Sequence, residues 1–227
     1  MKPLIIIPAR GGSKGVPKKN IKILGTQPLI KYTLDAAREV FSDKEICVST
    51  DSLEIKEIVE GFGLKVPFLR PKTLALDISS TYDVLLHALN YYREEKQYYP
   101  DIVILLQITS PFRTGHQIKE ALSLYEKSYD MVVSVKETSS NPYYVLFEEN
   151  NDGWLIKSKE GNFIRRQDCP KVWEYNGAIY VINPKSLEKF PMHEFKKIKK
   201  YVMDEESSLD IDTQLDWKIA EAIINSN

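Results

Sequence analysis

The chain has 227 residues, of which 43% are hydrophobic and 28% are charged, so it can form one large α/β domain with a substantial core. Its net charge of −1 excludes a general attraction to nucleic acid or anionic membrane, so any anion site has to be built locally. Two isolated cysteines and three scattered histidines exclude a disulfide framework and a zinc motif, and no apolar stretch approaches the roughly 20 residues that span a membrane. We therefore expect a single cytoplasmic domain over residues 1–227, with no nucleic-acid or membrane partner.

The first predicted element is a buried strand at Leu4–Pro8, which opens into a basic loop over residues 8–20. The apolar run is short and is followed by the basic loop instead of a small-residue cleavage site, which is not typical of a signal peptide. The basic loop holds three glycines, four lysines or arginines and no acid. Glycines let the backbone approach a ligand closely and the cations favour a strongly negative one, so the loop indicates a triphosphate site. The spacing is not that of a Walker A loop, and a solvated basic turn is the alternative interpretation.

Strand and helix patterns alternate up to residue 135, which predicts a doubly wound, mainly parallel α/β sheet. Continuous apolar runs such as Ile102–Leu106 favour strands that are buried on both faces. Ligands bind at the carboxyl ends of such strands, so the basic loop, Ser49–Ser52 and Gln107–Arg113 should meet at one rim. The predicted strands are Leu4–Pro8, Ile46–Thr50, Lys65–Leu69, Asp101–Gln107 and Met131–Val135, and the predicted helices are Leu29–Phe41, Leu53–Gly61, Thr81–Lys96 and Gln117–Lys127.

Polar side chains follow the third and fourth predicted strands. Ser79 and Ser80 stand where the next helix should begin, so capping is their ordinary interpretation, although a helix N-terminus can also bind phosphate. Gln107 and Thr109 come directly after a fully apolar strand, where the fold gives no reason for polar groups. Thr114 should only cap the following helix.

The pattern changes after residue 135. Tyr143–Glu149 and Trp154–Lys157 predict two strands around an Asn-Asn-Asp-Gly turn, which is a strong hairpin signal. The sheet pattern resumes at Ala178–Ile182, so residues 136–175 form an insertion between two sheet strands. An inserted apolar hairpin is typical of an oligomerisation element, and we expect a homodimer formed through it. A last helix is expected from about Thr213 to Ile224.

A pair of acids precedes this last helix. Asp210 and Asp212 are two residues apart in an expected extended segment, so both side chains should point to one face. Two such carboxylates repel each other unless a cation lies between them, and oxygen ligands without sulfur or imidazole suit Mg²⁺, with Mn²⁺ as a second option. The alternative is that Asp212 caps the last helix, which leaves Asp210 unexplained.

These motifs resemble the acylneuraminate cytidylyltransferases, also called CMP-sialic acid synthetases, whose relatives activate legionaminic, pseudaminic and 3-deoxy-octulosonic acids. The basic loop is similar to the family's A-R-x-x-S-K-G-x-x-x-K-N, whereas octulosonate enzymes usually carry a loop closer to A-R-x-x-S-T-R-L-P. Three further matches follow in the family's order, namely R-P-x-x-L-A-x-D-x-x-S-S from Arg70, L-Q-x-T-S-P-x-R from Leu106 and N-G-A-I-Y from Asn176. The resemblance covers nearly the whole chain and implies a Rossmann-like fold of the nucleotide-diphospho-sugar transferase type, with CTP and an acidic sugar as substrates.

The resemblance also implies roles for individual residues. The nucleotide would be held by Arg10, Ser13, Lys14, Lys19, Asn20, Arg70 and Ser80. The sugar would be contacted by Gln107, Thr109, Ser110, Arg166, Asn176 and Tyr180. Metal binding falls to Asp210 and Asp212, and the catalytic set comprises Arg10, Lys19, Asp210 and Asp212. For Tyr180, a core position on a strand is the alternative interpretation.

Two departures from the family pattern leave the sugar open. Glu174 stands where many sialate enzymes have a basic residue, and Tyr144 stands where they often have a lysine. The implied reaction transfers CMP from CTP to the 2-hydroxyl of a nine-carbon sugar acid and releases pyrophosphate. N-acylneuraminic acid is the first expectation, with deaminoneuraminic and legionaminic acids as alternatives and octulosonic acid behind them.

Two other classes of protein share some of these features. A non-catalytic nucleotide-binding protein on the same fold has no need of the acid pair or the loop lysines, and this chain has both. A transferase that moves sugar from a nucleotide-sugar uses D-x-D metal sites but does not need the basic loop. Both therefore explain the sequence less fully than cytidylyl transfer does.

Overall fold

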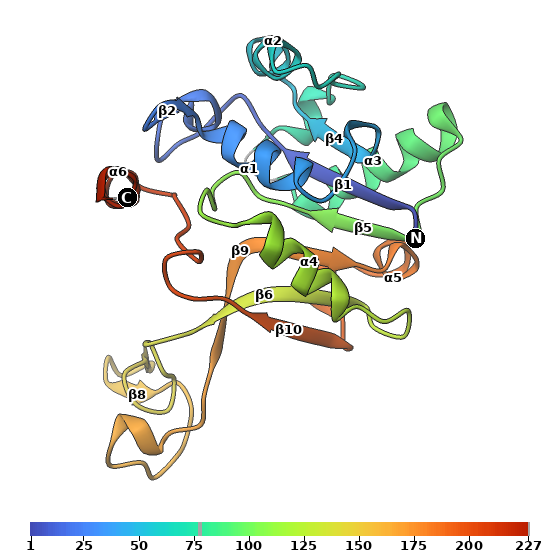
Figure 1. The fold of residues 1–227 in the computed structure, drawn as a ribbon. Coiled ribbons are helices and arrows are strands. Elements are labelled where there is room, and N and C mark those ends of the chain that lie inside the picture. The colour runs from blue at the N-terminus through green and yellow to red at the C-terminus, as the bar shows by residue number, and fades with distance from the viewer. Residues whose placement is uncertain (77–78, 227) are drawn as a thin grey trace.

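A six-stranded sheet runs through the centre of the molecule (Figure 1). The computed structural model describes residues 1–76 and 79–226. β1 pairs in parallel with β4 and β5, and β6 pairs in parallel with β10, whereas β9 is antiparallel to both β5 and β6. The prediction of a mainly parallel sheet is therefore confirmed. The strand order is β10 (Ile198–Val202), β6 (Met131–Glu137), β9 (Trp173–Ile182), β5 (Ile102–Leu105), β1 (Pro3–Pro8) and β4 (Ile46–Ser49).

Alternate side chains of the strands enter two apolar cores, one on each face of the sheet. In β1, Ile5 and Ile7 enter the first core and Leu4 and Ile6 enter the second, so the strand is buried on both faces. Helices cover both faces of the sheet, so the ends of the strands are the places where a ligand can reach it. The first core is covered by α1 (Leu29–Arg38), α2 (Leu53–Gly61), α4 (Gly115–Ser123) and α6 (Gln214–Ser226), and the second by α3 (Thr81–Lys96) and α5 (Pro184–Lys189).

Side-chain caps set the starts of several helices. The Ser80 hydroxyl accepts a hydrogen bond from the Asp83 N–H at the start of α3, as the capping interpretation predicted. Thr114 and Gln117 form a reciprocal capping box at the start of α4. The bounds of α2 and α3 agree with those predicted, whereas α1 and α4 end three and four residues earlier than the apolar pattern suggested.

Two strand predictions need correction. Residues 65–69 were predicted as a strand but form only one parallel bridge, between Leu69 and Thr50. Pro67 has no N–H to donate, and the N–H of Val66 bonds to the Glu60 side chain at 3.2 Å, so this segment offers few donors to a ladder. β10 was not predicted, because its lysines hide the apolar alternation. Lysines are common on edge strands, where they oppose pairing between molecules.

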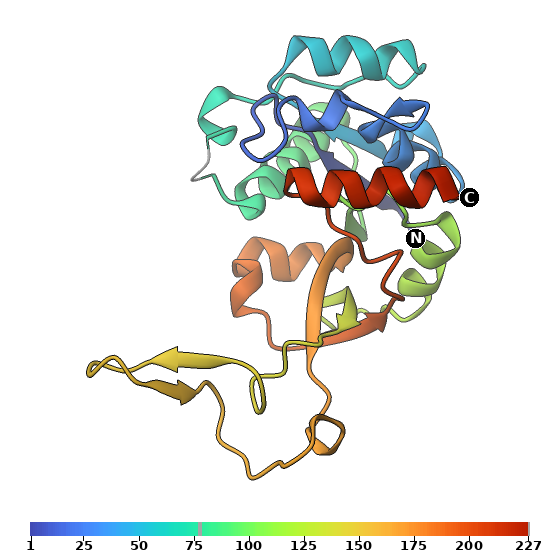
Figure 2. The same cartoon turned by 90° about the vertical axis from the view of Figure 1, so that its left-hand side faces the viewer.

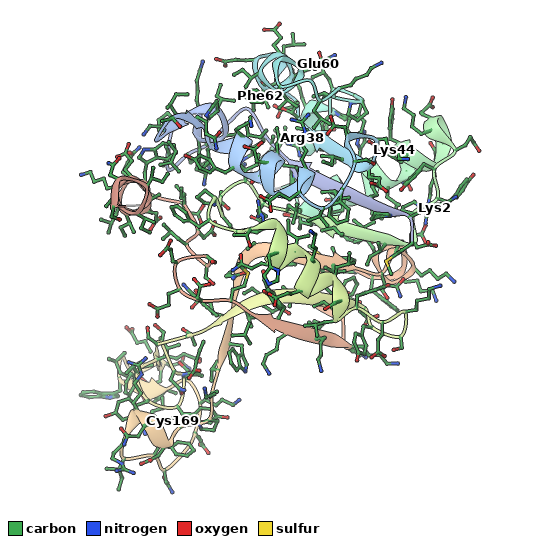
Figure 3. The ribbon with its side chains drawn as sticks, viewed as in Figure 1. Lys2, Arg38, Lys44, Glu60, Phe62 and Cys169 are labelled. Atoms are coloured by element: carbon green, nitrogen blue, oxygen red, sulfur yellow. The ribbon has the colours of Figure 1, made fainter. Side chains whose placement is uncertain are left out.

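The insertion projects from the sheet as a separate arm. β6 and β9 extend beyond their neighbours, pairing as far as Glu137 with Trp173, and carry the arm at their ends. Within it, β7 (Phe147–Glu149) and β8 (Leu155–Lys157) form the predicted hairpin, although its strands are shorter than expected. Figure 2 shows the hairpin reaching outward from the sheet, and Figure 3 shows the arm, marked by Cys169, apart from the helices.

The remaining elements are short and lie in the connections. Within residues 1–76 and 79–226, no helix has the combination of length and hydrophobicity that crossing a bilayer requires. The short strands are β2 (Ile23–Leu24) and β3 (Gln27–Pro28), and the 3-10 turns are η1 (Lys19–Ile21), η2 (Asp43–Glu45), η3 (Lys72–Leu74), η4 (Arg166–Asp168) and η5 (Met192–Glu194).

Candidate active site

A cavity of about 480 Å³ lies where the carboxyl ends of β1 and β5 open into loops. The basic loop and the segment after β5 meet there, as predicted, and the turn that precedes α3 closes a third side. The lining is polar toward the basic loop and apolar where Leu74, Ala75 and Leu76 face it. The predicted site residues that line the cavity are Arg10, Ser13, Lys14, Lys19, Asn20, Arg70, Gln107, Thr109 and Asp212.

Lys19 joins the basic loop to the acid pair. Its ammonium group donates to the carbonyl oxygen of Ile211 and to Oδ1 of Asp212, the latter at 2.9 Å, and its side chain is only 11% exposed. The backbone of the loop also touches this segment, since a Cβ on Gly15 would collide with the carbonyl oxygen of Asp212. The basic loop and the segment with the acid pair therefore meet at the cavity, which Asp212 lines and Asp210 does not.

Asn20 closes the basic loop on itself. Its side-chain amide donates to the carbonyl oxygen of Arg10 at 2.9 Å, and the side chain is buried at the edge of the cavity. This bond fixes the two ends of the loop relative to each other. The predicted position of Asn20 near the ribose is compatible with its place in the lining, and the contact itself stays a prediction.

The acid pair consists of one half-buried carboxylate, Asp210, and one exposed carboxylate, Asp212. The segment is held by the Ile211 N–H, which donates to the carbonyl oxygen of Thr109 at 2.8 Å. Burial raises the pKa of Asp210, and the charges of Asp212 and Asp216 add to the rise, while the Thr109 hydroxyl and Lys19 oppose it. The Asp212 side chain is 71% exposed and carries the bond to Lys19.

The capping alternative for Asp212 is wrong. The α6 helix begins at Gln214, and the Thr213 hydroxyl accepts from the N–H of Asp216 while the Asp216 carboxylate accepts from the N–H of Thr213. Thr213 is therefore the residue that caps α6, and Asp212 does not cap this helix.

Asp210 and Asp212 fit a hard divalent cation. Oδ1 of Asp210 is buried and makes no hydrogen bond beyond the contact with the Thr109 hydroxyl that lowers its pKa, so this carboxylate keeps oxygen lone pairs for a cation. In the described part of the chain, no group of three or more histidine, cysteine, aspartate or glutamate side chains gathers as a metal site. Any ion here would have to complete its shell with phosphate oxygens and waters, as Mg²⁺ usually does.

The segment after β5 is held by the buried side chain of Arg113, for which the sequence indicated no function. Arg113 donates to the carbonyl oxygens of Gln107 at 2.9 Å and Ala178 at 2.8 Å, and to the Thr33 hydroxyl at 2.7 Å. Burial lowers its pKa to about 9. It ties the segment to α1 and β9, and so fixes where Gln107 enters the cavity.

Asn176 serves the fold of the site in this structure. Its Oδ1 accepts from the Ser134 hydroxyl at 2.5 Å and from the Ala178 N–H, and its amide nitrogen donates to the Ser208 hydroxyl at 2.8 Å. The side chain is buried and does not line the cavity. A sugar contact from Asn176 would require these bonds to be exchanged.

Tyr180 and Ser110 do not line the cavity, although Tyr180 lies close enough to Asp210 to feel its charge. Burial raises the pKa of Tyr180 to about 12, with contributions from Asp210 and Tyr175, so its phenol keeps its proton and can donate a hydrogen bond. Ser110 is fully buried, and its hydroxyl lies 3.5 Å from the carbonyl oxygen of Asn176, to which it donates.

Two other predicted residues are not brought to the cavity of this chain. Ser80 caps α3, while its neighbours Ser79 and Thr81 line the cavity. Arg166 lies in the insertion, exposed at the start of η4 and beside Glu137 instead of the basic loop. A role for Arg166 in this cavity therefore needs either a large movement or a second chain. Asp77 of the same motif as Ser80 lies outside the described residues.

Comparison with known proteins identifies the family. The family model described as cytidylyltransferase matches residues 4–222. The chain belongs to the cytidylyltransferase family. The resemblance drawn from the motifs is thereby confirmed.

Two curated relatives of this cytidylyltransferase match over almost its whole length. An N-acylneuraminate cytidylyltransferase of Streptococcus agalactiae serotype V is 37% identical over 222 residues, covering 96% of this chain and 52% of that protein. The chain thus spans about half the length of this relative. A CMP-N,N'-diacetyllegionaminic acid synthase of Legionella pneumophila is 33% identical over 230 residues, covering 100% of this chain and 98% of that protein.

A solved structure shows the same fold. It is a CMP:2-keto-3-deoxy-manno-octonic acid synthetase complexed with CTP, with a TM-score of 0.73 and 19% identity, covering 100% of this chain and 99% of that one. At this identity the likeness establishes the architecture of the sheet and helices.

Proposed function

We propose that this cytidylyltransferase transfers CMP from CTP to the 2-hydroxyl of a nine-carbon 2-keto-3-deoxy sugar acid. The observation that carries the proposal is the meeting of the basic loop with the acid pair, through Lys19, Ile211 and Asp212, at one cavity. The names of the relatives support this class of acceptor. A cytoplasmic location, expected from the sequence, stays a prediction.

The reaction is a substitution at phosphorus. The 2-hydroxyl oxygen forms a bond to the α-phosphorus of CTP and gives up its proton to solvent, the bond from that phosphorus to the bridging oxygen breaks, and pyrophosphate leaves. Such transfers are catalysed mainly by positioning and by neutralising charge. Arg10, Lys14 and Lys19 line the cavity and supply three cations for the triphosphate. The apolar surface of Leu74, Ala75 and Leu76 is suited to the base.

The acid pair is proposed to hold magnesium, with manganese as a substitute. Asp210 and Asp212 would be its protein ligands. When bound, the ion would neutralise phosphate charge and make the attacking hydroxyl more acidic. Lys19 donates to Asp212, so its ammonium group would be available to the triphosphate if Asp212 held the ion.

The sugar is proposed to lie on the side of the cavity formed by Gln107 and Thr109. This side would be completed by the phenol of Tyr180, which can donate a hydrogen bond beside Asp210, and by the hydroxyl of Ser110. The carboxylate of the sugar would meet Arg166 supplied by a second chain, since Arg166 lies in the insertion.

N-acylneuraminic acid is the first proposal for the acceptor. One observation favours legionaminic acid as the second: the legionaminic acid synthase matches over 98% of its own length, whereas the N-acylneuraminate enzyme matches over 52%. Glu174 lies 3.6 Å from Lys136 across the strand pair, so this position presents an ion pair instead of a free cation.

A pyrophosphate-release assay tests the reaction. Purified protein with CTP, Mg²⁺ and N-acylneuraminic acid should release pyrophosphate and form a CMP-sugar in equal amounts. Omission of the acid should stop the release, because water is not the proposed acceptor. Pyrophosphate release that is independent of any sugar acid would contradict the proposal.

A further inference from the structure

Asp51, directly after β4, touches two nucleotide-binding elements without lining the cavity. Its Oδ1 accepts a hydrogen bond from the Gly11 N–H at 2.9 Å, in the middle of the basic loop. The same oxygen lies 3.6 Å from Nη2 of Arg70. The sequence predicts that Asp51 lies at the rim formed by the carboxyl ends of the strands and indicates no function for it.

The bond to Gly11 continues the pairing of β1 with β4 into the loop. In this parallel ladder, the Ala9 N–H donates to the carbonyl oxygen of Ser49 at 2.9 Å. The next rung would join the Gly11 N–H to the backbone of residue 51, and the Asp51 carboxylate takes that place instead. The contact is close, because a Cβ on Gly11 would lie 3.0 Å from Cβ of Ser52.

Arg70 holds the Asp51 carboxylate in turn. The Arg70 side chain is 3% exposed, and its backbone N–H donates to the carbonyl oxygen of Thr50 at 2.7 Å, so it is fixed to the same strand end. Burial lowers the pKa of Arg70 and the nearby Arg10 lowers it further, whereas Asp51 opposes both effects. Asp51 is therefore the acid that offsets part of the positive charge of Arg70 and Arg10 at this site.

We propose that Asp51 is a positioning residue for CTP, which fixes the basic loop through Gly11 so that the loop cations face the triphosphate. The inference rests on the proposed function, since it names what orders the nucleotide site. Asp51 itself does not line the cavity, and an acid at this place would by charge alone weaken the binding of a triphosphate.

Two substitutions separate position from charge. Asp51→Asn and Asp51→Ala remove the same charge, but only the asparagine keeps an oxygen that can accept from Gly11. Measured by calorimetry, Asp51→Ala should weaken CTP binding about tenfold, the loss expected when a bond to a charged acceptor disappears, whereas Asp51→Asn should stay within about threefold of wild type. The KM for CTP should rise in the alanine variant more than kcat falls, because the loop is misplaced before chemistry begins.

Glu54 provides the matched control. It pairs with Lys18 on the same loop at 2.8 Å, in an exposed position, so Glu54→Gln and Glu54→Ala should bind CTP equally. If Asp51→Ala binds CTP as tightly as Asp51→Asn, Asp51 acts by charge alone and the inference is overturned. A wild-type chain that binds no CTP would instead overturn the proposed function.

Hydrogen exchange tests the bond to Gly11 without any substitution. In the wild-type protein the amide of Gly11 should exchange much more slowly than that of the exposed Gly12 beside it. Equal exchange rates for the two glycines would contradict the inference, whether or not the alanine variant folds.

Discussion

Lys19 is the residue whose environment says most about the chemistry. It is the cation that links the basic loop to the acid pair, and its side chain is largely shielded from water. We expect Lys19→Ala to lower kcat by about 100-fold or more, in the range seen when a preorganised charge partner of a transition state is removed. Steady-state kinetics with the folded variant gives the measurement.

Lys18 is the matched control for this variant. It is adjacent in sequence but pairs with Glu54 at an exposed surface. Lys18→Ala should keep turnover within about threefold of wild type, since exposed ion pairs contribute little. Near-normal turnover in Lys19→Ala would refute the triphosphate role.

Asp210 should show a conflict between activity and stability. Its raised pKa means that the folded protein disfavours the charged carboxylate. The resulting loss of folding free energy is absent below pH 3.8, the ordinary pKa of the group, and is complete once the pH has risen through the higher pKa of the folded state. Asp210→Asn should therefore abolish activity yet raise Tm at pH 7, by about 2–4 °C for each 1 kcal/mol relieved. The gain in Tm should narrow as the pH falls toward 4.

Asp212→Asn should also abolish activity but leave Tm nearly unchanged, because this carboxylate is exposed. Calorimetric scans at several pH values compare the two variants. An active Asp210→Asn at ordinary magnesium concentration, or a pH-independent loss of stability, would disprove the metal role.

At this scale the sequence indicated the cations that line the cavity, because loops after buried strands expose them. It did not predict that Asn176 and Arg113 bond to the protein itself, since a polar side chain beside an apolar strand looks the same whether it bonds to protein or to substrate. The sequence indicated no function for Asp51, because an acid is unexpected beside a cation-rich loop. The proposed positioning role follows only from its distances to Gly11 and Arg70.

The insertion exposes large apolar side chains that the rest of the described chain does not cover. A two-stranded hairpin is at best marginally stable alone in water, and the insertion leaves Trp154 71% exposed in its hairpin and Ile164 89% exposed beyond it. We expect a homodimer that buries this arm, with a mass twice the 26.2 kDa of one chain by light scattering. Trp154→Glu with Ile164→Glu should produce monomers.

Leu53 serves as the control for these substitutions, since it is 61% exposed on α2 and outside the insertion. Leu53→Glu should leave the mass unchanged. A wild-type monomer at micromolar concentration would disprove dimerisation through the insertion.

Arg166 allows a test of shared active sites. If it acts on the partner's cavity, Arg166→Ala and Lys19→Ala chains should each be inactive alone, and an equal mixture should regain about a quarter of wild-type activity, since half of the dimers are mixed and each has one intact site of two. Chains in which both substitutions are combined should gain nothing when mixed with themselves. No recovery on mixing would show that Arg166 does not act in this way.

Among the elements, strong periodicity was the reliable guide. Continuous apolar runs gave β1, β4, β5 and β6, and the bounds of α2 and α3 were predicted to the residue. The pattern failed at residues 65–69, where apolar residues pack without enough donors for a ladder. It also failed at β10, where edge lysines mask the alternation. In both cases the neighbour in the sheet decides the outcome, and a single segment does not carry that information.

For the whole molecule, the alternation of strands and helices was sufficient to predict the sheet and the edge at which the cavity lies. The position of the acid pair was not predictable from alternation, since the segment with Asp210 and Asp212 follows the last sheet strand and returns to the first loop. Its contact with Gly15 and Lys19 is a product of the complete fold. Motif resemblance supplied the link that topology alone did not.

The most direct test of the central claim compares acceptor acids with CTP and Mg²⁺ held constant. We predict pyrophosphate release matched by CMP-sugar formation, with the highest kcat/KM for N-acylneuraminic acid among N-acylneuraminic, deaminoneuraminic and legionaminic acids. A preference of about tenfold, or about 1.4 kcal/mol, for one of the other two would change the acceptor but not the reaction. Turnover with the eight-carbon octulosonic acid alone, or with none of the acids, would contradict the proposed function.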